Sequence, residues 1–424
     1  MKILLLGSGG REHALSWKIS RSPLCSQLYI APGNPGTAQH GINIALSVND
    51  FAAISAFCKE QNIEMLIVGP EDPLVNGIYD ELKNELPGLK IIGPSKHASQ
   101  LEGSKAFAKE FMLQYGIPTA GYKEFTIDNF EDGKAYLRAH PLPIVLKADG
   151  LAAGKGVVIC KEHSEALKVF DEMILRRQFG EASAKVVVEE FLDGIEVSVF
   201  VLTDGKYYQV IGHAKDYKRI GEADTGPNTG GMGCVSPVPF VDDVFMKKVI
   251  DRIIEPTING FHSSGFDYKG FVFFGLIKVG DDPKVIEYNC RMGDPETEVV
   301  MPLLKNDIVD LFLKTCEGKL QDVTVEFEDK AAATIMLVSA GYPGNYSKGK
   351  RIVLPADKSD NTIIFQAGTT MQNDELVTNG GRVITVTSLA DTISEAVAMS
   401  RETAGQIVFE GAYFRNDIGY EFEN

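Results

Sequence analysis

The sequence of 424 residues predicts a multidomain protein of α/β and α+β class, with a parallel sheet near its N-terminus. Three observations support this prediction. Strand and helix signals alternate over residues 1–100, a glycine-rich segment lies between two short apolar runs at 144–160, and a charged stretch near 325–330 precedes a last group of short strands. A chain of this length has room for two to four domains with buried cores.

The N-terminal residues, 1–101, are predicted to form a parallel α/β domain. Four apolar runs read as strands and two segments read as helices; in chain order they are KILLLG, REHALSWKIS, QLYIAPGN, FAAISAFCKEQN, MLIVGPE and LKIIGPS. Continuous apolar runs separated by helices are typical of a parallel sheet covered on both faces. Three strands end in glycine or proline turns, and such carboxyl ends line the ligand crevice of an open parallel sheet.

The first turn, GSGGREH at 7–13, departs from the dinucleotide-binding pattern because Glu12 stands where the last glycine would be. No acidic residue closes the second strand to hold a ribose. The glycines still leave a helix N-terminus open to an anion, which suits one phosphate group of a substrate better than NAD. A tight strand-to-helix turn without a ligand is the alternative, and this motif alone does not decide between them.

The middle of the chain, residues 102–327, is predicted to contain two hairpins, one across Asp204–Gly205 and one across GDD at 280–282. Its other elements are a helix over EGSKAFAKEFMLQYG, a helix near 164–177, a strand at 185–194, a loop at 221–233 and a long helix at 241–263. Residues 328–424 read as a separate α+β domain. Its expected elements are strands near 332–338, 351–354, 363–367 and 383–387 and a helix near 391–405.

The segment IVLKADGLAAGKGVVIC at 144–160 places two lysines among three glycines. Glycine carries no Cβ, so backbone N–H groups and lysines can approach phosphate oxygens closely. The spacing is not that of a Walker A loop, which has four residues between its first glycine and the Gly-Lys pair, followed by Ser or Thr. Because both flanks read as short strands, a strand–loop–strand flap over nucleotide phosphates is predicted.

The segment VIEYNCRMGDPE at 285–296 contains candidate metal ligands. Side chains alternate along a strand, so Glu287 and Asn289 point the same way. A carboxylate and an amide oxygen suit Mg²⁺, which usually shares its shell with substrate phosphates. Arg291, just past the strand, could clamp a carboxylate or phosphate with two hydrogen bonds. A solvated strand face is the alternative for the first two residues.

A third segment, VVVEEFLDGIE at 186–196, passes from a buried strand to polar residues. Backbone groups from Glu189 to Leu192 could bond an adenine edge, and Glu196 could accept from ribose hydroxyls. Taken alone, the segment is better explained as a strand that leaves the core with solvated acids.

Composition excludes several classes of function. A formal charge of −16 argues against a broad nucleic-acid or anionic-membrane surface. Six scattered cysteines without a CxxC pair, and seven histidines without HxH or HExxH spacing, indicate a reduced cytoplasmic protein without a thiolate or imidazole zinc site. The longest N-terminal apolar run, ILLL, is too short for a signal peptide or a membrane span.

The order of five motifs resembles that of the ATP-grasp ligases: LEGSK, KADGLAAGKGV, EEFLDGIE, DTGPNTGGMG and VIEYNCRMGDPE. With GSGGREH, APGN and VGPE ahead of them and TNGGRV behind, the chain is similar from end to end to the glycinamide ribonucleotide synthetase family. The resemblance implies an N-terminal substrate-binding domain at 1–101, an ATP-grasp domain at 102–327 with a flap subdomain at about 122–191, and a small C-terminal domain at 328–424.

That family joins glycine to 5-phosphoribosylamine in de novo purine biosynthesis and converts ATP to ADP and phosphate through a glycyl phosphate. The resemblance therefore implies ATP as co-substrate, Mg²⁺ or Mn²⁺ as cofactor, and small-molecule substrates with no obligate protein partner. Such chemistry needs positioning and charge neutralisation more than a covalent nucleophile. Another ATP-grasp ligase or carboxylase, and a non-catalytic ATP-binding regulator, are the alternatives.

The resemblance also assigns roles to individual residues. The implied ATP-binding residues are Lys105, Lys147, Gly150, Gly154, Gly156, Glu189, Leu192 and Glu196. The implied substrate-binding residues are Gly9, Gly10, Arg11, Asp216, Lys218, Asn228, Thr229, Gly230, Arg291 and Asp294. Arg291 and Lys155 take catalytic roles, and Glu287 and Asn289 hold the metal. The strand GFVFFGLIKV lacks the carboxylate that many ATP-grasp proteins place there, so phosphates and water would complete the metal shell.

Overall fold

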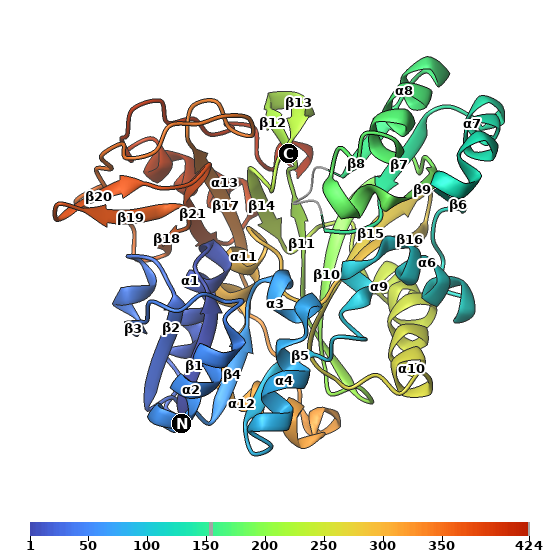
Figure 1. The fold of residues 1–424 in the computed structure, drawn as a ribbon. Helices are drawn as coiled ribbons and strands as arrows, with labels where there is room; N and C mark the ends of the chain where they lie inside the picture. Colours follow the sequence, from blue (N-terminus) through green and yellow to red (C-terminus); the bar gives the residue numbers. More distant parts are fainter. Residues whose placement is uncertain (152–155, 423–424) are drawn as a thin grey trace.

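The computed structural model describes residues 1–151 and 156–422. Within these ranges, a 13-stranded sheet runs through the body of the molecule, and a four-stranded sheet with two helices projects from it (Figure 1). The predicted multidomain α/β and α+β class is confirmed. No helix in the described ranges is both long and apolar enough to cross a membrane.

The N-terminal part contains the predicted parallel sheet. Its strands are β1 (Lys2–Gly7), β2 (Gln27–Pro32), β3 (Ile42–Asn43), β4 (Met65–Val68) and β5 (Lys90–Pro94), and its helices are α1 (Gly10–Ile19), α2 (Phe51–Gln61), α3 (Glu71–Asn76) and α4 (Ile78–Glu85). Leu4 and Leu6 of β1 pack into one buried cluster, whereas Ile3 and Leu5 pack into another. Because both faces of β1 are covered, its residues form an unbroken apolar run.

The expected helix over EGSKAFAKEFMLQYG is broken into α5 (Gln100–Gly103) and α6 (Lys105–Gln114). Ser104 between them has an extended backbone, and its hydroxyl accepts from the N–H of Phe107, which caps α6. Serine is a favoured N-cap residue because its hydroxyl can accept from a backbone N–H. The apolar pattern continues across Ser104, so the pattern alone does not reveal the break. The prediction of one continuous helix is therefore wrong, and the break turns Lys105 into the first residue of a helix.

Both predicted hairpins are confirmed. They consist of β10 (Ile195–Thr203) with β11 (Tyr208–Asp216), and β15 (Tyr268–Val279) with β16 (Asp282–Asn289). The predicted long helix is present as α9 (Asp243–Val249), a π turn at Ile250–Ile254 and α10 (Glu255–Ser263). The π turn ends two residues before Pro256, whose missing N–H removes one helical hydrogen bond. The predicted loop at 221–233 contains a short ladder of β12 (Arg219–Gly221) with β13 (Thr225–Asn228).

The projecting sheet confirms the predicted strand–loop–strand arrangement. Its strand order is β6 (Tyr122–Thr126), β9 (Lys185–Glu190), β7 (Ile144–Ala148) and β8 (Val157–Cys160), and all neighbouring strands are antiparallel. The helices α7 (Phe130–Ala139) and α8 (His163–Ile174) pack against this sheet. We call these elements the flap sheet. It has its own core, in which Leu146, Phe170 and Val188 are fully buried.

The C-terminal part adds an antiparallel layer to the large sheet. Its elements are β17 (Ala331–Val338), β18 (Thr362–Gln366), β19 (Thr369–Gln372), β20 (Glu375–Thr378), β21 (Arg382–Ala390) and α13 (Ile393–Ala404). The prediction of a strand at 351–354 is wrong. Arg351 pairs singly with Val377 and Val353 pairs singly with Val408, so neighbouring residues bond different segments and form no ladder.

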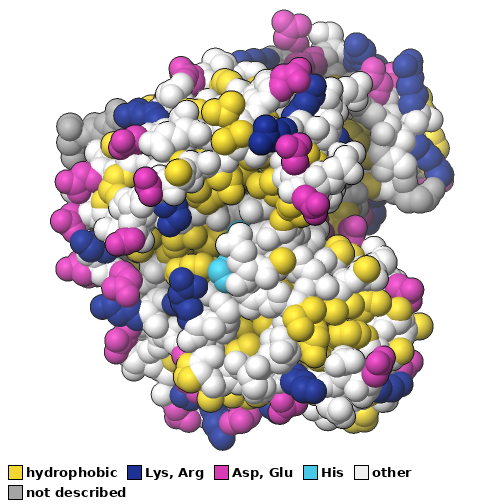
Figure 2. Space-filling view, turned by 90° about the vertical axis from the view of Figure 1, so that its left-hand side faces the viewer, with side chains coloured by type: hydrophobic (Ala, Val, Ile, Leu, Met, Phe, Trp, Pro, Cys, Tyr) yellow, Lys and Arg dark blue, Asp and Glu magenta, His cyan; other side chains and the backbone are white. Residues whose placement is uncertain are grey.

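One continuous sheet connects the parts that the sequence separates. Its strand order is β18-β21-β17-β14-β11-β10-β15-β5-β4-β1-β2-β3, with β14 (Gly233–Ser236) joining the central hairpin to β17 and β16 pairing with β15. Two further helices, α11 (Thr297–Leu303) and α12 (Ile308–Glu317), follow β16. On the face drawn in Figure 2, acidic and basic side chains are interspersed.

Candidate active site

Charged side chains from distant parts of the chain converge on the turn between β16 and α11. Arg291 in this turn forms ion pairs with Glu71 of α3 and Glu102 of α5. Asp294, three residues later, contacts Arg11 of α1 and Arg382 of β21. The site therefore lies where the N-terminal sheet, the central hairpins and the C-terminal strands meet.

Lys105 and Lys147, the two lysines predicted to contact ATP phosphates, both lie near β16. Burial lowers the pKa of Lys105, and the nearby carboxylate of Glu287 opposes that shift. Lys147 is in β7, where its Nζ lies 2.9 Å from Oε2 of Glu189 and donates to the carbonyl of Ile286 at 3.3 Å. The structure thus brings both ammonium groups close to the predicted metal strand.

The predicted flap residues are only partly described: Gly150 and Gly156 are included, whereas Gly154 and Lys155 lie outside the described residues. The carbonyl of Gly150 accepts from the Nζ of the lysine that starts α6, at 3.1 Å. Asp149, which no pattern in the sequence singled out, accepts from the N–H of Ala106 at 2.8 Å. These contacts tie the end of β7 to the beginning of α6.

Glu287 and Asn289 lie on the same face of β16, as the strand period predicts. Gly275 of β15 is the register partner of Glu287, and a Cβ there would come within 2.9 Å of the Glu287 Cγ. The neighbouring strand therefore leaves room for this carboxylate. The described residues hold no group of three or more His, Cys, Asp or Glu side chains arranged for a metal ion. Two oxygen donors fit a cation that takes its remaining ligands from phosphates and water.

Arg291 is held between two carboxylates. Its Nη2 lies 2.8 Å from Glu102 Oε1, and its Nε lies 3.3 Å from Glu71 Oε2. Glu102 also accepts from the N–H of Cys290 at 2.7 Å. Burial raises the pKa of Glu102 to about 7, and the Arg291 guanidinium opposes part of that shift. Sequence reasoning missed both carboxylates, although they lie inside the motifs VGPE and LEGSK.

Asp294 is fixed by two basic residues. Its Oδ1 lies 2.9 Å from Nη2 of Arg382, and its Oδ2 accepts from the N–H of Arg11 at 3.1 Å. Burial alone would raise the pKa of Asp294, but these two arginines hold that pKa below its usual range. Arg382 also donates to the carbonyl of Gly230 at 2.5 Å. Arg382 was missed as well, although the motif TNGGRV contains it.

A cavity of about 400 Å³ opens beside Asp294. Its lining residues are Gly7, Ser8, Gly9, Arg11, Glu12, Pro32, Ser47, Val48, Pro70 and Asp294. The residues that follow or end β1, β2 and β4 thus share one crevice; of the three predicted turns, those after β2 and β4 line it, and the GPS turn at 93–95 does not. The N–H of Gly9 already donates to Glu12 Oε2 at 2.7 Å, and Gly10 packs directly against Glu298. Carboxylates therefore occupy much of this helix N-terminus.

Asp216, Lys218 and Glu196 form a second charged group. The Nζ of Lys218 lies 2.5 Å from Glu196 Oε2. Burial raises the pKa of Asp216, and Lys218 opposes that shift. Thr229 joins the group, because its N–H and hydroxyl both donate to the carbonyl of Lys218, at 2.7 and 2.8 Å. Asn228, in contrast, is exposed on β13.

The segment predicted to contact adenine lies at the end of β9. Glu189 is in register with Tyr122 of β6 and with Val145 of β7, so its backbone lies inside the flap sheet. β9 ends at the next residue, which leaves Leu192 outside the ladder. The Glu189 side chain is buried, and besides Lys147 it pairs with Lys109, a residue that sequence reasoning missed.

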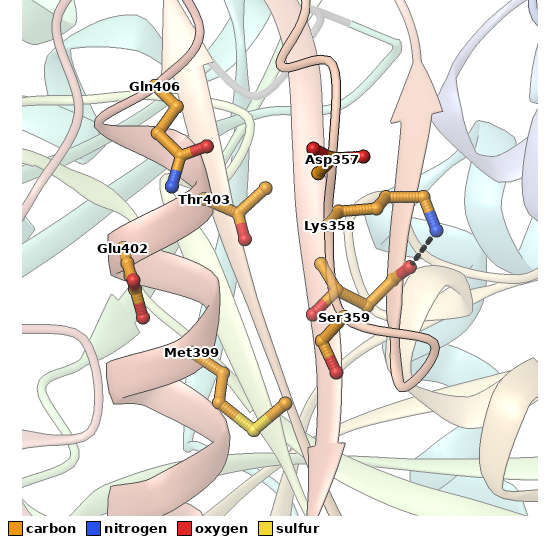
Figure 3. Close-up of a pocket in the computed structure, with 8 residues that line it drawn as sticks. Asp357, Lys358, Ser359, Met399, Glu402, Thr403 and Gln406 are labelled. Carbon is orange, nitrogen blue, oxygen red and sulfur yellow. Dashed lines mark hydrogen bonds between the residues drawn. The ribbon is translucent and has the colours of Figure 1, made fainter.

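Another pocket, of about 290 Å³, lies between α13 and the segment before β18 (Figure 3). Lys358, Glu402 and Gln406 are among its lining residues, and Lys358 donates to the carbonyl of Thr362 at 2.6 Å. None of the predicted site residues lines it.

Comparison with known proteins covers nearly the whole chain. The sequence matches the family models of phosphoribosylglycinamide synthetase: the N domain over residues 1–102, the ATP-grasp (A) domain over 103–297 and the C domain over 332–421. A curated relative from Haemophilus influenzae, named phosphoribosylamine–glycine ligase, is 47% identical over 99% of this chain and 98% of its own length. A relative of the same name from Agrobacterium fabrum is 46% identical over the same shares of the two chains.

Solved structures agree with these matches. The crystal structure of phosphoribosylamine–glycine ligase from Thermotoga maritima has a TM-score of 0.85 and 33% identity, and covers 98% of this chain and 100% of its own. The biotin carboxylase domain of the Hydrogenobacter thermophilus 2-oxoglutarate carboxylase has a TM-score of 0.73 at 16% identity, covers 97% of this chain and 91% of its own, and shares only the fold. With its N, ATP-grasp and C domains in that order, the chain belongs to the phosphoribosylglycinamide synthetase family.

Proposed function

We propose that the protein joins glycine to 5-phosphoribosylamine with ATP, giving glycinamide ribonucleotide, ADP and phosphate. One observation carries the proposal: relatives named phosphoribosylamine–glycine ligase match 99% of the chain at 46 to 47% identity. The charged site supports it, because paired cations, oxygen donors and a crevice meet within one region. The family's place in purine biosynthesis and a cytoplasmic location are part of the same proposal, and the six cysteines, all unpaired, suit a reducing compartment.

In this proposal, ATP lies between the flap sheet and β16. Lys105 and Lys147 neutralise its phosphates, and the 150–156 loop covers them, with Gly154 and Lys155 at its centre. Backbone groups near Leu192 bond the adenine, and Glu196 accepts from the ribose. The burial of Lys147 and the partial burial of Lys105 support these roles, because an ammonium acts on a phosphate more strongly where water is excluded.

Glu287 and Asn289 would hold Mg²⁺ or Mn²⁺, which would supply positive charge to neutralise the negative charge that develops during transfer. Arg291 would orient the glycine carboxylate, since its guanidinium is already fixed by two carboxylates and needs little reordering. Asp294, Asp216, Lys218 and the loop Asn228–Gly230 would surround the two acceptor substrates.

The 5′-phosphate of phosphoribosylamine would enter the crevice at Gly9, Gly10 and Arg11. The N–H groups of Gly9 and Arg11 donate to carboxylates of Glu12 and Asp294 in this structure. A phosphate at this helix N-terminus must therefore replace one of these carboxylates or bind through the Arg11 guanidinium.

The proposed reaction has two steps. A glycine carboxylate oxygen attacks the γ-phosphorus; a new P–O bond forms, the bond to ADP breaks, and the carboxylate becomes an acyl phosphate. The amine lone pair of phosphoribosylamine then attacks the carbonyl carbon; the C–N bond forms, inorganic phosphate leaves with the C–O bond pair, and the amine loses a proton. The chain contributes position and charge to both steps and forms no covalent bond to substrate.

The test is ADP release with Mg²⁺, ATP and glycine, with and without freshly made phosphoribosylamine. We expect ADP only when both substrates are present, with the amide product formed in equal amount. Bicarbonate or another amine in place of phosphoribosylamine serves as control. Turnover driven by such a substitute would overturn the assignment, as would ATP binding with no turnover under any of these conditions.

A further inference from the structure

Lys147 is buried in this structure, although its proposed partner is a nucleotide phosphate. The residue is 5% exposed, and its Nζ lies 2.9 Å from Glu189 Oε2. Glu189 is itself 4% exposed. To neutralise a phosphate fully, the ammonium of Lys147 must weaken this buried ion pair. A carboxylate left behind without a partner in the protein interior would make that exchange unfavourable.

A second lysine is placed to prevent that outcome. Lys109 of α6 is 2% exposed, and its Nζ lies 3.2 Å from the other carboxylate oxygen of Glu189, Oε1. Oε1 accepts no well-aligned hydrogen bond within the described residues, so the contact is an ion pair held by charge. One carboxylate thus has two ammonium partners, one on each oxygen. If Lys147 leaves for a phosphate, Lys109 still neutralises Glu189.

Lys109 is also the more firmly anchored of the two lysines. Its Nζ donates to the hydroxyl of Thr119 at 2.8 Å and to the carbonyl of Ala120 at 3.1 Å. The Thr119 hydroxyl in turn donates to the carbonyl of Val285 in β16, at 2.7 Å. The anchor therefore connects α6, the segment that leads into the flap sheet, and the predicted metal strand.

The ionisation of Lys109 is compatible with this arrangement at neutral pH. Burial lowers the pKa of Lys109 to about 8, and the carboxylate of Glu189 opposes part of that shift. The side chain therefore keeps its ammonium form at pH 7. None of the contacts of Lys109 in the described part of the chain involves a residue to which we assign a substrate contact, apart from Glu189.

We propose that Lys109 is a positioning residue for nucleotide binding, which keeps Glu189 neutralised while Lys147 exchanges that carboxylate for ATP phosphates. The inference rests on the proposed contact of Lys147 with the phosphates. It predicts that Lys109 acts on the phosphate end of the nucleotide only, through Lys147, and not on the nucleoside end.

The test compares Lys109→Met with Lys109→Arg in the full-length protein. In Lys109→Met, Glu189 retains Lys147 as its one cation and competes with the phosphates, so we expect the KM for ATP to rise at least tenfold and kcat to fall less. The inhibition constant of adenosine, which has no phosphate, should stay within about twofold. Lys109→Arg keeps the charge and should restore most of the ATP affinity. Thermal melting verifies that each variant is folded.

Two further variants make the result specific. Lys185 forms a half-exposed ion pair with Glu124 in the same flap sheet, at 2.9 Å, so Lys185→Met controls for the loss of any lysine there and should leave the KM unchanged. In the double variant Lys109→Met/Glu189→Gln, the competing carboxylate is gone, and ATP affinity should recover relative to Lys109→Met. Such recovery is a coupling that a merely structural role of Lys109 would not produce.

Several results would overturn the inference. An unchanged KM for ATP in Lys109→Met would do so, as would an equal loss of ATP and adenosine affinity or a double variant no better than the single one. Lys147→Met separates this inference from the proposed function. If that variant binds ATP normally, the phosphate role of Lys147 fails. If Lys147→Met is impaired and Lys109→Met is not, only the role of Lys109 fails.

Discussion

The two sides of the site are built from different cations. On the flap side the cations are Lys105, Lys109 and Lys147, and the last two share the carboxylate of Glu189. On the acceptor side three cations, Arg11, Arg291 and Arg382, are arginines, with Lys218 as a further cation, and Arg291 is held by two carboxylates. A lysine ammonium is a point charge on a flexible stem, whereas a guanidinium is a planar fork that keeps its geometry. In the proposed function, this difference would let the nucleotide side exchange partners, while the acceptor side would be fixed before substrates arrive.

The largest expected effect comes from the strand between the two sides. Glu287→Ala should reduce metal-dependent turnover by about two to three orders of magnitude, because a single carboxylate supplies the protein's charge to the metal. Circular dichroism should show an intact fold. Near-normal turnover across a Mg²⁺ titration would show that Glu287 is not a metal ligand. The metal would then not connect the two sides of the site through this residue.

Removing the flap loop tests the exchanging side as a whole. Deletion of residues 150–156 should raise the KM for ATP or abolish turnover, because the loop is expected to exclude water from the phosphates. The KM for glycine should change less, since Arg291 lies on the other side of the site. Steady-state kinetics with each substrate varied in turn would measure both values. Unchanged kcat and KM would refute the flap assignment.

Arg291→Lys tests the fixed side. A lysine cannot satisfy Glu71 and Glu102 at once and still present two parallel donors, so kcat/KM for glycine should fall about a hundredfold, which corresponds to about 2.7 kcal/mol. The matched change on the other side, Lys147→Arg, should cost far less if that side tolerates exchange. Equal losses in the two variants would contradict the distinction between the sides.

Gly275→Ala addresses the space beside the metal strand. The added methyl group would lie 2.9 Å from Glu287 Cγ and displace that carboxylate. We expect the Mg²⁺ concentration for half-maximal activity to rise roughly tenfold, which corresponds to about 1.4 kcal/mol and lies within the usual cost of a small overpacking. ATP affinity measured without metal should not change. If ATP affinity measured without metal falls, the substitution has displaced other parts of the site besides the Glu287 carboxylate.

The expected effects on stability have opposite signs on the two sides. Burial raises the pKa of Glu102 to about 7, so the folded state binds more protons between roughly pH 4.3 and 7, and the stability from this group is lost as pH rises. Burial lowers the pKa of Lys109 to about 8, so the unfolded state binds more protons between about pH 8 and 10.4, and stability rises with pH there.

Urea unfolding at a series of pH values would measure both slopes. Glu102→Gln should flatten the acid slope alone, and Lys109→Met the alkaline slope alone. If Glu102→Gln leaves the acid slope unchanged, or Lys109→Met the alkaline slope, the buried group that was replaced does not titrate as described.

Local patterns singled out residues that the structure brings close together, but not the residues that hold them in place. Glu287, Asn289, Arg291 and Lys147 stand in motifs whose spacing indicates their chemistry. Glu102 holds Arg291 in place and also accepts a hydrogen bond from the N–H of Cys290, a residue 188 positions away in the sequence. No spacing rule connects such positions, because the contact exists only after the sheet has brought α5 beside β16.

By itself, the sequence determined the class of the fold, the buried strands, both hairpins and the motifs of an ATP-grasp ligase. The fold class, the strands and the hairpins depend on local properties, apolar period and turn chemistry, whereas the ATP-grasp motifs were identified by their resemblance to a family. The tertiary structure alone decided that Ser104 breaks a helix, that residues 351–354 form no ladder and that one carboxylate serves two lysines. Those outcomes depend on which distant groups compete for the same hydrogen bond or charge, and burial sets the strength of that competition.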